Sequence, residues 1–454
     1  MANKLFGSSG IRGIVGEKLT TEFCVDIGKS IGSLLPEGSN VCISTDARVT
    51  KDYIKNAVLI GILSTGVNVT DFGLLPTSIL AFTTKHLKFD SGVMITASHN
   101  PPEFSGMKLW SSEGMGYSKN KEIEIEKLYE SKKFRKVSWD KIGILTKRDD
   151  AVEGYFKVIK EKFPNIKSDL KILVDPGNGA MSGIASKLFN ELGLNIITMS
   201  DKPNGMFPNR NPEPKRETLT KTIEKLNQEN ADIAICFDGD GDRVVFCDKR
   251  GFIEYNEAIG FVAKNIISNS KDKICITTVE TGMLFDLAVK TESGTVKRCE
   301  VGDVFVARAA KEKNAKMGVE QCGHYIIPEL GFYPDTIYPT LSLIKNIKSA
   351  DEIREFFTKI KSLFYDKIGV ECKDEEKYVI VDKISKLETK LKPLEINTLD
   401  GMRMEFSDGW ILIRASGTQP LIRVNAEAET QERLKEFLCE GKRLINLIIC
   451  KVQK

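Results

Sequence analysis

The stretch Thr96-Ala97-Ser98-His99-Asn100-Pro101-Pro102 follows a run of apolar residues at positions 92–95. The apolar run is typical of a buried strand. The two prolines exclude an immediate helix, so the chain must leave the strand in an extended or turning conformation. Ser98 is therefore expected on a constrained loop at a strand end, where sheet proteins usually carry their chemistry. A serine beside a histidine is by itself a weak indication, because most serines in turns only satisfy the backbone.

A second predicted strand, residues 231–237, leads into Asp238-Gly239-Asp240-Gly241-Asp242-Arg243. Three carboxylates at alternate positions of so short a segment need a positive charge among them. The glycines allow a tight turn, and a hard divalent cation with oxygen ligands fits three converging carboxylates best. An EF-hand is excluded, because that loop needs glycine where Arg243 stands and glutamate where Lys249 stands. The sequence therefore predicts a metal site held by these three aspartates.

Two other segments match nucleotide-binding motifs only in part. Gly177-Asn178-Gly179 follows a predicted strand, but Ser182 stands where the dinucleotide fingerprint needs its third glycine. Gly28-Lys29-Ser30 resembles the end of a P-loop, but Phe23 stands where the first glycine belongs, and the triplet lies inside a predicted helix. Neither a nicotinamide cofactor nor a P-loop nucleotide is therefore expected.

Three further loops carry charged or polar groups that are candidates for a functional site. Phe6-Gly7-Ser8-Ser9-Gly10-Ile11-Arg12-Gly13 offers backbone amides and one guanidinium to an anion. Glu320-Gln321-Cys322-Gly323-His324 follows a predicted strand at residues 316–319. Near the end of the chain, Arg414 and Arg423 flank Ala415-Ser416-Gly417-Thr418-Gln419-Pro420, and together they form a candidate phosphate cradle.

Composition restricts the class of protein. A chain of 454 residues is expected to form about three or four domains, and its 41% hydrophobic content is that of a soluble, core-forming protein. The net charge of +3 gives no electrostatic case for nucleic acid or membrane, and no apolar run is long enough for a membrane span. The first residues lack the pattern of a secretory signal, and the ten cysteines include no C-x-x-C pair. We therefore expect reduced thiols in a cytoplasmic protein.

The loops, in their order along the chain, resemble the α-D-phosphohexomutase superfamily, which includes phosphoglucosamine mutases and phosphomannomutase/phosphoglucomutases. The resemblance covers essentially the whole chain and is carried by F-G-S-S-G-I-R-G at 6–13, T-A-S-H-N-P at 96–101, F-P-N-R-N-P-E-P at 207–214, D-G-D-G-D-R at 238–243, V-E-Q-C-G-H at 319–324 and R-A-S-G-T-Q-P at 414–420. Cys322 stands where the family usually has serine, and Gln419 where it usually has glutamate.

The resemblance implies an α/β fold: three related mixed-sheet α/β domains and a smaller α+β C-terminal domain around a central cleft. The expected boundaries are 1–150 for the domain with the phosphoserine loop, 151–255 for the domain with the metal-binding loop, 256–368 for the domain with the sugar-recognition loop and 369–454 for the phosphate-binding domain. The alternation of helical and strand patterns along the chain agrees with this division.

The function implied by the resemblance is the interconversion of sugar 6-phosphate and sugar 1-phosphate through a phosphoserine enzyme and a 1,6-bisphosphate intermediate. One Mg²⁺ per chain and the sugar 1,6-bisphosphate as activator are the implied cofactors, and the partner is a small hexose phosphate, bound by a monomer or homodimer. Glu320-Gln321 and Val301-Gly302-Asp303 look more like phosphoglucosamine mutases than the dual-specificity enzymes. Mannose, glucose or pentose phosphates are the alternatives, as is a catalytically inactive sugar-phosphate-binding relative.

The residues implied by the resemblance fall into three groups. Ser98 carries the phosphoryl group, and its phosphate binds the metal together with Asp238, Asp240 and Asp242. Lys108 transfers a proton or stabilises charge, His99 transfers a proton or orients the loop, and Arg12 and Arg243 stabilise the transferring phosphoryl group. The substrate is held by Glu320, Cys322, His324, Arg414, Ser416, Gly417, Thr418 and Arg423.

Overall fold

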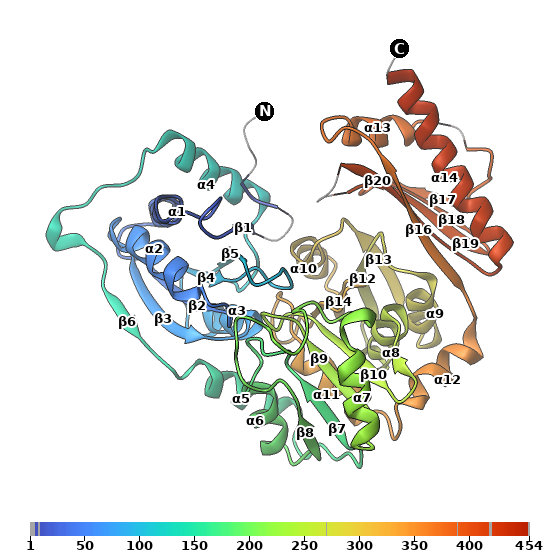
Figure 1. The fold of residues 1–454 in the computed structure, drawn as a ribbon, viewed down its shortest axis with the longest axis horizontal. Coiled ribbons are helices and arrows are strands. Elements are labelled where there is room, and N and C mark those ends of the chain that lie inside the picture. Colours follow the sequence, from blue (N-terminus) through green and yellow to red (C-terminus); the bar gives the residue numbers. More distant parts are fainter. Residues whose placement is uncertain (1–4, 8–9, 269, 388, 417–419, 453–454) are drawn as a thin grey trace.

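The computed structural model describes residues 5–7, 10–268, 270–387, 389–416 and 420–452. Four α/β units follow one another along the chain (Figure 1). The sheets of the first three units mix parallel and antiparallel strands, and the fourth sheet is antiparallel throughout. The expected fold class is therefore confirmed.

Domain I contains a six-stranded sheet in the order β1-β5-β4-β2-β3-β6, in which β5 runs against both of its neighbours. Its elements are β1 (Ile11–Ile14), α1 (Thr21–Leu34), β2 (Asn40–Thr45), α2 (Lys51–Leu63), β3 (Asn68–Leu74), α3 (Thr77–His86), β4 (Ser91–Ile95), β5 (Phe104–Ser111), α4 (Lys119–Ser131), the 3₁₀ helix Trp139–Lys141 and β6 (Leu145–Lys147). Gly28 lies in the middle of α1, and a Cβ there would come within 2.1 Å of the Val58 carbonyl oxygen. The Gly28-Lys29-Ser30 triplet therefore serves helix packing.

Domain II has the sheet order β11-β10-β9-β7-β8, with β7, β8 and β9 parallel. Its elements are α5 (Ala151–Lys162), β7 (Ile172–Asp175), α6 (Ile184–Glu191), β8 (Ile196–Thr198), the 3₁₀ helix Arg216–Thr218, α7 (Thr220–Gln228), β9 (Ile233–Phe237), β10 (Val244–Asp248) and β11 (Gly251–Phe252). The segment with Gly177 and Gly179 follows β7. The next helix, α6, begins only at Ile184, so no helix starts at these glycines as the dinucleotide-binding motif requires.

Domain III has the sheet order β13-β12-β14-β15, in which only β15 is antiparallel to its neighbour. Its elements are α8 (Tyr255–Ile267), β12 (Ile274–Thr278), α9 (Met283–Thr291), β13 (Thr295–Cys299), α10 (Asp303–Glu312), β14 (Met317–Val319), β15 (Tyr325–Ile326), α11 (Ile337–Lys345) and α12 (Asp351–Ile360).

Domain IV has the sheet order β16-β20-β19-β18-β17. Its elements are β16 (Phe364–Glu371), α13 (Lys377–Ile384), β17 (Glu395–Asn397), β18 (Met402–Phe406), β19 (Gly409–Ala415), β20 (Leu421–Ala428) and α14 (Gln431–Val452). The expected boundary between residues 368 and 369 falls inside β16, because this strand pairs with β20 over its whole length. The charged segment at residues 372–376 connects β16 to α13 within domain IV.

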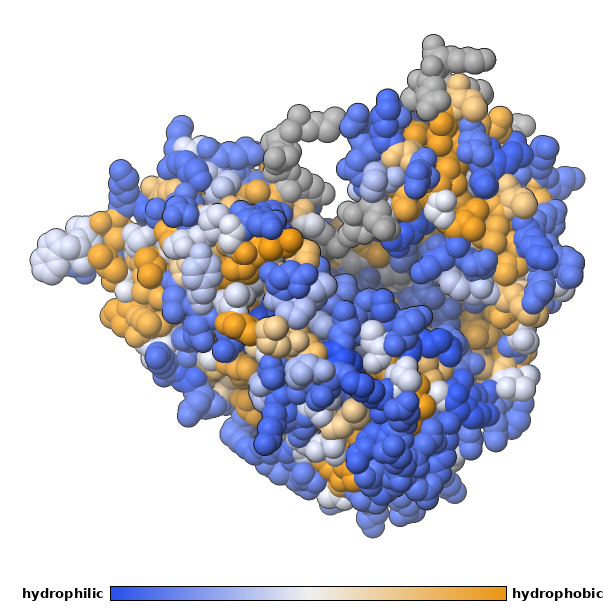
Figure 2. Space-filling model, viewed as in Figure 1, coloured by the Kyte–Doolittle hydropathy of each residue, from blue (hydrophilic) through white to orange (hydrophobic). Residues whose placement is uncertain are grey.

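One apolar cluster spans the first three domains, each of which also has a smaller cluster of its own, and domain IV has a separate core. Tyr155 of α5 illustrates the sharing: its ring packs against Phe82 of α3, and its hydroxyl donates to Asp335 of domain III at 2.6 Å. Domain IV meets domain III through a polar contact, in which buried Arg403 donates to the carbonyl oxygens of Val279 and Thr281. Figure 2 shows the molecular surface hollowed between domain I and domain IV.

The topology places three loops at equivalent points of the three related domains. Each loop joins a parallel strand to the antiparallel strand that follows it: β4 to β5, β9 to β10 and β14 to β15. These are the loops of Ser98, of the three aspartates and of Glu320 and His324. Within the described residues no helix is long and apolar enough to cross a bilayer.

Candidate active site

Ser98 stands at a strained position in the turn after β4. Its φ is +52°, a left-handed conformation that serine rarely adopts. Local hydrogen bonds support this conformation: the Ser98 backbone N–H donates to Thr96 Oγ1 at 2.8 Å, and the Thr96 hydroxyl donates to Asp46 Oδ2 at 2.6 Å. The backbone of the loop is therefore tied to the end of the neighbouring strand β2.

Arg48 also holds the Ser98 loop in position, and this role was not expected from the sequence. Its buried guanidinium pairs with Asp46 at 3.0 Å and donates to four backbone carbonyl oxygens. The acceptors are the carbonyl oxygens of Ser98 (2.9 Å), Asn100 (2.6 Å), Pro101 (2.5 Å) and Phe104 (2.8 Å). A planar group with five N–H donors can meet these acceptors, whereas an ammonium cannot.

Substituting Arg48→Lys is expected to lower kcat by about 10- to 100-fold while KM changes little, because the loop loses its fixed position but not its chemistry. Arg135→Lys is the matched control. Arg135 also donates to backbone carbonyl oxygens of domain I, those of Thr65 and Gly32, away from the Ser98 loop. Steady-state kinetics of both variants test this. An equal decrease in kcat in the two variants would contradict the assignment of Arg48 as the residue that positions the Ser98 loop.

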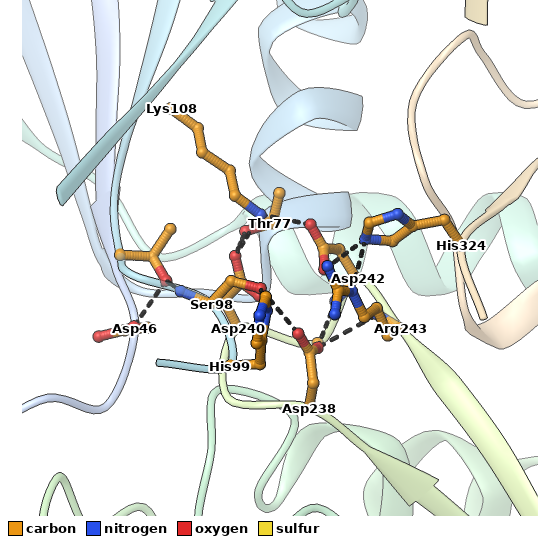
Figure 3. A network of polar contacts seen from close by, with 12 residues as sticks. Asp46, Thr77, Ser98, His99, Lys108, Asp238, Asp240, Asp242, Arg243 and His324 are labelled. Atoms are coloured by element: carbon orange, nitrogen blue, oxygen red, sulfur yellow. Dashed lines mark hydrogen bonds and ion pairs between the residues drawn. The ribbon is translucent and has the colours of Figure 1, made fainter. Parts of the chain in front are cut away.

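The aspartate loop reaches the Ser98 loop across the boundary between domains I and II (Figure 3). The Ser98 hydroxyl donates to Asp238 Oδ2 at 2.9 Å. The two backbones also approach closely, because a Cβ at Gly239 would lie 2.5 Å from the Ser98 carbonyl oxygen. Gly241, with φ of +73°, completes the turn, and the backbone N–H of Asp242 donates to Asp238 Oδ1 at 3.1 Å. Glycine at 239 and 241 thus allows the serine and the acids to meet.

Lys108 of β5 balances part of the negative charge in this cluster. Its Nζ lies 2.8 Å from Asp240 Oδ2 and also contacts Asp242 Oδ2. Burial disfavours the charged amine, but Asp240 and Asp242 outweigh this effect and raise the pKa of Lys108 above its ordinary value. The two carboxylates therefore stabilise the protonated form of Lys108 in the protein without a metal ion.

The three aspartates fit a divalent metal ion. One carboxylate oxygen from each lies within 4.8 Å of the other two, and all three side chains are fully buried. Asp240 Oδ2 accepts from Thr77 and Lys108, but Asp240 Oδ1 is buried and has no hydrogen-bond partner among the described residues. A buried carboxylate oxygen without a donor is costly, and a cation bound to it removes that cost. The donor set, oxygen only, suits Mg²⁺.

Asp238 shows the same excess of negative charge. Burial, with repulsion from Asp240 and Asp242, raises the pKa of Asp238 to about 8. In the metal-free protein the folded state therefore binds a proton that the unfolded chain releases near pH 4. Binding of this proton therefore adds to the free energy of unfolding. The contribution is complete below about pH 4 and is lost as the pH rises through about 8.

Thermal unfolding in the presence of a chelator is accordingly expected to show a midpoint that falls between pH 6 and pH 8.5. Excess Mg²⁺ should reduce this dependence, because the ion takes the place of the proton. Asp238→Asn, whose amide is neutral throughout, should reduce it as well. A midpoint with the same pH dependence in all three samples would contradict the assignment.

Two arginines and a histidine surround the cluster. Arg12 of β1 donates to the side chain of Asn100 at 2.8 Å, and Arg243 follows the aspartates directly. His99 Nδ1 lies 3.4 Å from the Ser98 hydroxyl. Burial and the positive charges of Arg243 and Arg12 lower the pKa of His99 to about 2, so the imidazole is neutral at physiological pH.

The loop between β14 and β15 adds a second pair of polar side chains. His324 Nδ1 lies 2.7 Å from Glu320 Oε2, and His324 Nε2 lies 3.1 Å from Asp242 Oδ1. Burial opposes a charge on His324, but Cys322 and Asp242 outweigh it and raise its pKa well above the ordinary value. The Glu320 carboxylate also accepts from the backbone N–H of Gly302 at 2.9 Å. His324 thus links the loop between β14 and β15 to the aspartate loop.

The predicted phosphate cradle lies apart, in domain IV. Arg414 of β19 pairs with Asp400 at 2.8 Å and with Glu280 of domain III at 3.0 Å. Arg423 faces Arg414 across the β19–β20 pair, and Ser416 is buried. Gly417 and Thr418 lie outside the described residues. The role of these residues stays a prediction.

Three supporting residues escaped the sequence reasoning: Asp46 and Arg48, which hold the Ser98 loop, and Thr77, whose hydroxyl donates to Asp240 at 2.6 Å. A signal was available. Asp46-Ala47-Arg48 follows strand β2, which is parallel to and beside β4, so its side chains were bound to emerge at the same sheet edge as Ser98.

Comparison with known proteins agrees with this geometry. Models of phosphoglucomutase/phosphomannomutase domains match the chain in order: α/β/α domain I at residues 3–136, domain II at 153–251, domain III at 255–361 and the C-terminal domain at 368–440. A phosphoglucomutase/phosphomannomutase of Thermococcus kodakarensis is 37% identical, with 97% of this chain and 98% of the relative covered. A probable phosphoglucosamine mutase of Pyrococcus horikoshii is 36% identical, with 98% of each chain covered.

A crystal structure of a phosphoglucomutase/phosphomannomutase family protein from Burkholderia thailandensis has the same fold, with a TM-score of 0.88, 25% identity and 98% of each chain covered. The four domain matches together span most of the chain and follow the family's order. The chain therefore belongs to the phosphoglucomutase/phosphomannomutase family.

Proposed function

We propose that this protein is a phosphohexomutase that moves a phosphoryl group between the 6- and 1-positions of a hexose through a phosphorylated Ser98, with glucosamine phosphate as the preferred substrate. The observation that supports this most directly is the contact of the Ser98 hydroxyl with Asp238 inside the aspartate cluster. A nucleophilic oxygen beside a site for a divalent cation is the arrangement that phosphoryl transfer requires.

We assign each step of the proposed reaction to particular residues of the chain. The Arg48 clamp and the Thr96–Asp46 hydrogen bonds hold Ser98 in position. Asp238, Asp240 and Asp242 would hold one Mg²⁺, which when bound neutralises charge on the phosphoryl oxygens. The P–O bond to Ser98 breaks as the bond to the sugar hydroxyl forms, giving the 1,6-bisphosphate. After the sugar turns over in the cleft, its other phosphoryl group returns to Ser98. Free bisphosphate serves as activator, because it can phosphorylate Ser98.

The cationic side chains around Ser98 are proposed to stabilise the negative charge of the transferring phosphoryl group. Lys108, which contacts Asp240 and Asp242, is placed to stabilise this charge or to exchange a proton with the sugar hydroxyl. Arg12 and Arg243 are the guanidinium donors for the transferring group. His99, neutral and 3.4 Å from the Ser98 hydroxyl, is better suited to orient the loop than to carry charge.

The choice of glucosamine rests on the carboxylates of domain III. Glu320 is held by His324 and by the backbone N–H of Gly302, and buried Asp303 follows directly. A carboxylate beside the amino group of the sugar favours an ammonium over a hydroxyl, and Glu320 is the carboxylate that we propose for this contact. The two relatives of nearly equal identity bear the names of different sugars, so overall similarity does not choose between them.

A coupled assay with Mg²⁺ and a bisphosphate primer, across glucosamine, glucose and mannose phosphates, tests the proposal. We expect kcat/KM for glucosamine phosphate to be highest by about tenfold or more, the worth of one charge-assisted contact. Glu320→Gln should narrow this ratio. Faster turnover of glucose or mannose phosphate would reject glucosamine phosphate as the preferred substrate but would still support mutase activity. If none of the three sugar phosphates were turned over, the protein would instead be a catalytically inactive relative.

A further inference from the structure

The loop between β14 and β15 carries three different metal-binding groups on one side. The carboxylate of Glu320, the thiol of Cys322 and the imidazole of His324 each offer one atom within 4.8 Å of the other two. The loop is held in this shape by its own backbone: Glu320 N–H donates to the His324 carbonyl oxygen at 3.0 Å, and Gly323 N–H to the Glu320 carbonyl oxygen at 3.1 Å. Unlike the aspartate cluster, this set contains sulfur and nitrogen.

We propose that Glu320, Cys322 and His324 form a second metal site, specific for a thiophilic divalent ion of the zinc class and distinct from the aspartate site. Thiolate, imidazole and carboxylate are the ligands that zinc prefers, whereas Mg²⁺ takes oxygen ligands. Three protein ligands leave a fourth position for water, as in sites that remain open to exchange.

The distances in the loop fit a tetrahedral ion. Bonds of about 2.3 Å to sulfur and about 2.0 Å to nitrogen place these two atoms about 3.5 Å apart. Cys322 Sγ and His324 Nδ1 are 3.5 Å apart. The gap between His324 Nδ1 and Glu320 Oε2 is 2.7 Å, and it must open to about 3.3 Å to admit the ion. A small rotation of the glutamate side chain supplies this change, and the sulfur and nitrogen need not move.

The surroundings of His324 also suit a ligand. In the structure Nε2 accepts from the Nε–H of Arg243 at 3.1 Å, so binding of the ion to Nδ1 requires the other tautomer, in which Arg243 turns aside and Nε2–H donates to Asp242 Oδ1, 3.1 Å away. A carboxylate behind a metal-bound imidazole is the usual outer partner in zinc sites, where it fixes the tautomer and orientation. Binding of the ion displaces the proton that lies between Nδ1 and Glu320. Cys322 is partly exposed, so an ion can reach the loop from the cleft.

A consequence rests on the proposed function. Glu320 and His324 are also the proposed sugar ligands, so an ion held by them would exclude the sugar. Zinc is accordingly expected to inhibit the mutase in competition with sugar phosphate, and excess Mg²⁺ should not relieve the inhibition.

Cobalt(II) is a suitable probe, because its absorption reports thiolate ligation directly. The full-length protein, freed of metal by a chelator and then saturated with Mg²⁺ to fill the aspartate site, would be titrated with Co²⁺ without substrate. We expect a near-ultraviolet thiolate-to-cobalt band that saturates at one ion per chain and disappears when Zn²⁺ is added. Cys322→Ser should abolish the band and weaken zinc binding by at least about tenfold. Cys439→Ser, which alters an exposed thiol on α14, is the matched control and should keep the band.

The proposal would be overturned by the absence of a thiolate band in the unaltered protein, by its persistence in Cys322→Ser, or by its loss in Cys439→Ser alone. Inhibition kinetics with zinc test the placement of the sugar separately from the metal site. If the band behaves as expected but zinc does not compete with sugar phosphate, the metal site stands and the placement of the sugar on Glu320 and His324 fails.

Discussion

Ser98→Ala is expected to reduce mutase activity by about 10⁴-fold or more, because the variant has no oxygen to carry the phosphoryl group between the two sugar positions. The affinity for Mg²⁺ should change little, since Asp238, Asp240 and Asp242 remain. Turnover would be measured in a coupled assay with bisphosphate primer and Mg²⁺ binding by calorimetry. Intact-mass analysis after incubation with bisphosphate should show phosphorylation of the unaltered protein and none at this position in the variant.

Ser105→Ala is the matched control for this experiment. Ser105 lies on β5 beside the same loop, and its buried hydroxyl has no hydrogen-bond partner among the described residues. Its loss should leave both activity and Mg²⁺ affinity nearly unchanged. Comparable turnover by Ser98→Ala and Ser105→Ala would reject the phosphoserine mechanism.

The second large effect is expected from Asp240→Asn. This substitution preserves the shape of the side chain but removes the negative charge from the oxygen that lies buried without a donor. We expect Mg²⁺ affinity to fall sharply and kcat/KM to fall on the order of 10³-fold, because a bound metal ion contributes several kcal/mol to stabilising the transferring phosphoryl group. Calorimetric titration with Mg²⁺ and the coupled assay measure the two losses.

Asp248→Asn serves as the control, because Asp248 is a buried acid on the same β9–β10 hairpin but pairs with Arg354 at 2.6 Å. Its loss should lower stability and leave Mg²⁺ affinity unchanged. If Asp240→Asn bound Mg²⁺ as tightly as Asp248→Asn, the ion would have to be held by other residues.

Local patterns were sufficient for much of the candidate site. The aspartates at 238, 240 and 242 follow one strand with glycines between them, so their convergence could be predicted from covalent geometry alone. Ser98 could be placed at a strand end for the same reason. The strands expected at residues 231–237 and 316–319 correspond closely to β9 and β14, because the hydrophobic pattern of a strand is local.

Contacts between distant segments could not be predicted in this way. The carbonyl oxygens that Arg48 binds lie about 50 residues further along the chain, and no local pattern specifies which backbone groups a buried guanidinium will meet. The boundary expected at 368/369 falls inside β16 for a related reason: the pairing of β16 with β20 is a long-range contact that no local pattern specifies. Arg414, expected in the phosphate cradle, also pairs with Glu280 of another domain.

The sequence by itself determined the chemistry: a serine on a constrained loop, an acidic triplet that requires a cation, and a loop with glutamate, cysteine and histidine. Residue type and spacing suffice for this, because donor atoms and backbone freedom are properties of neighbouring residues. Only the tertiary structure decided that Ser98 touches Asp238, that Lys108 lies between two aspartates and that His324 joins the third loop to them. Those contacts depend on how three sheets pack around a shared core, and packing is set by the whole chain at once.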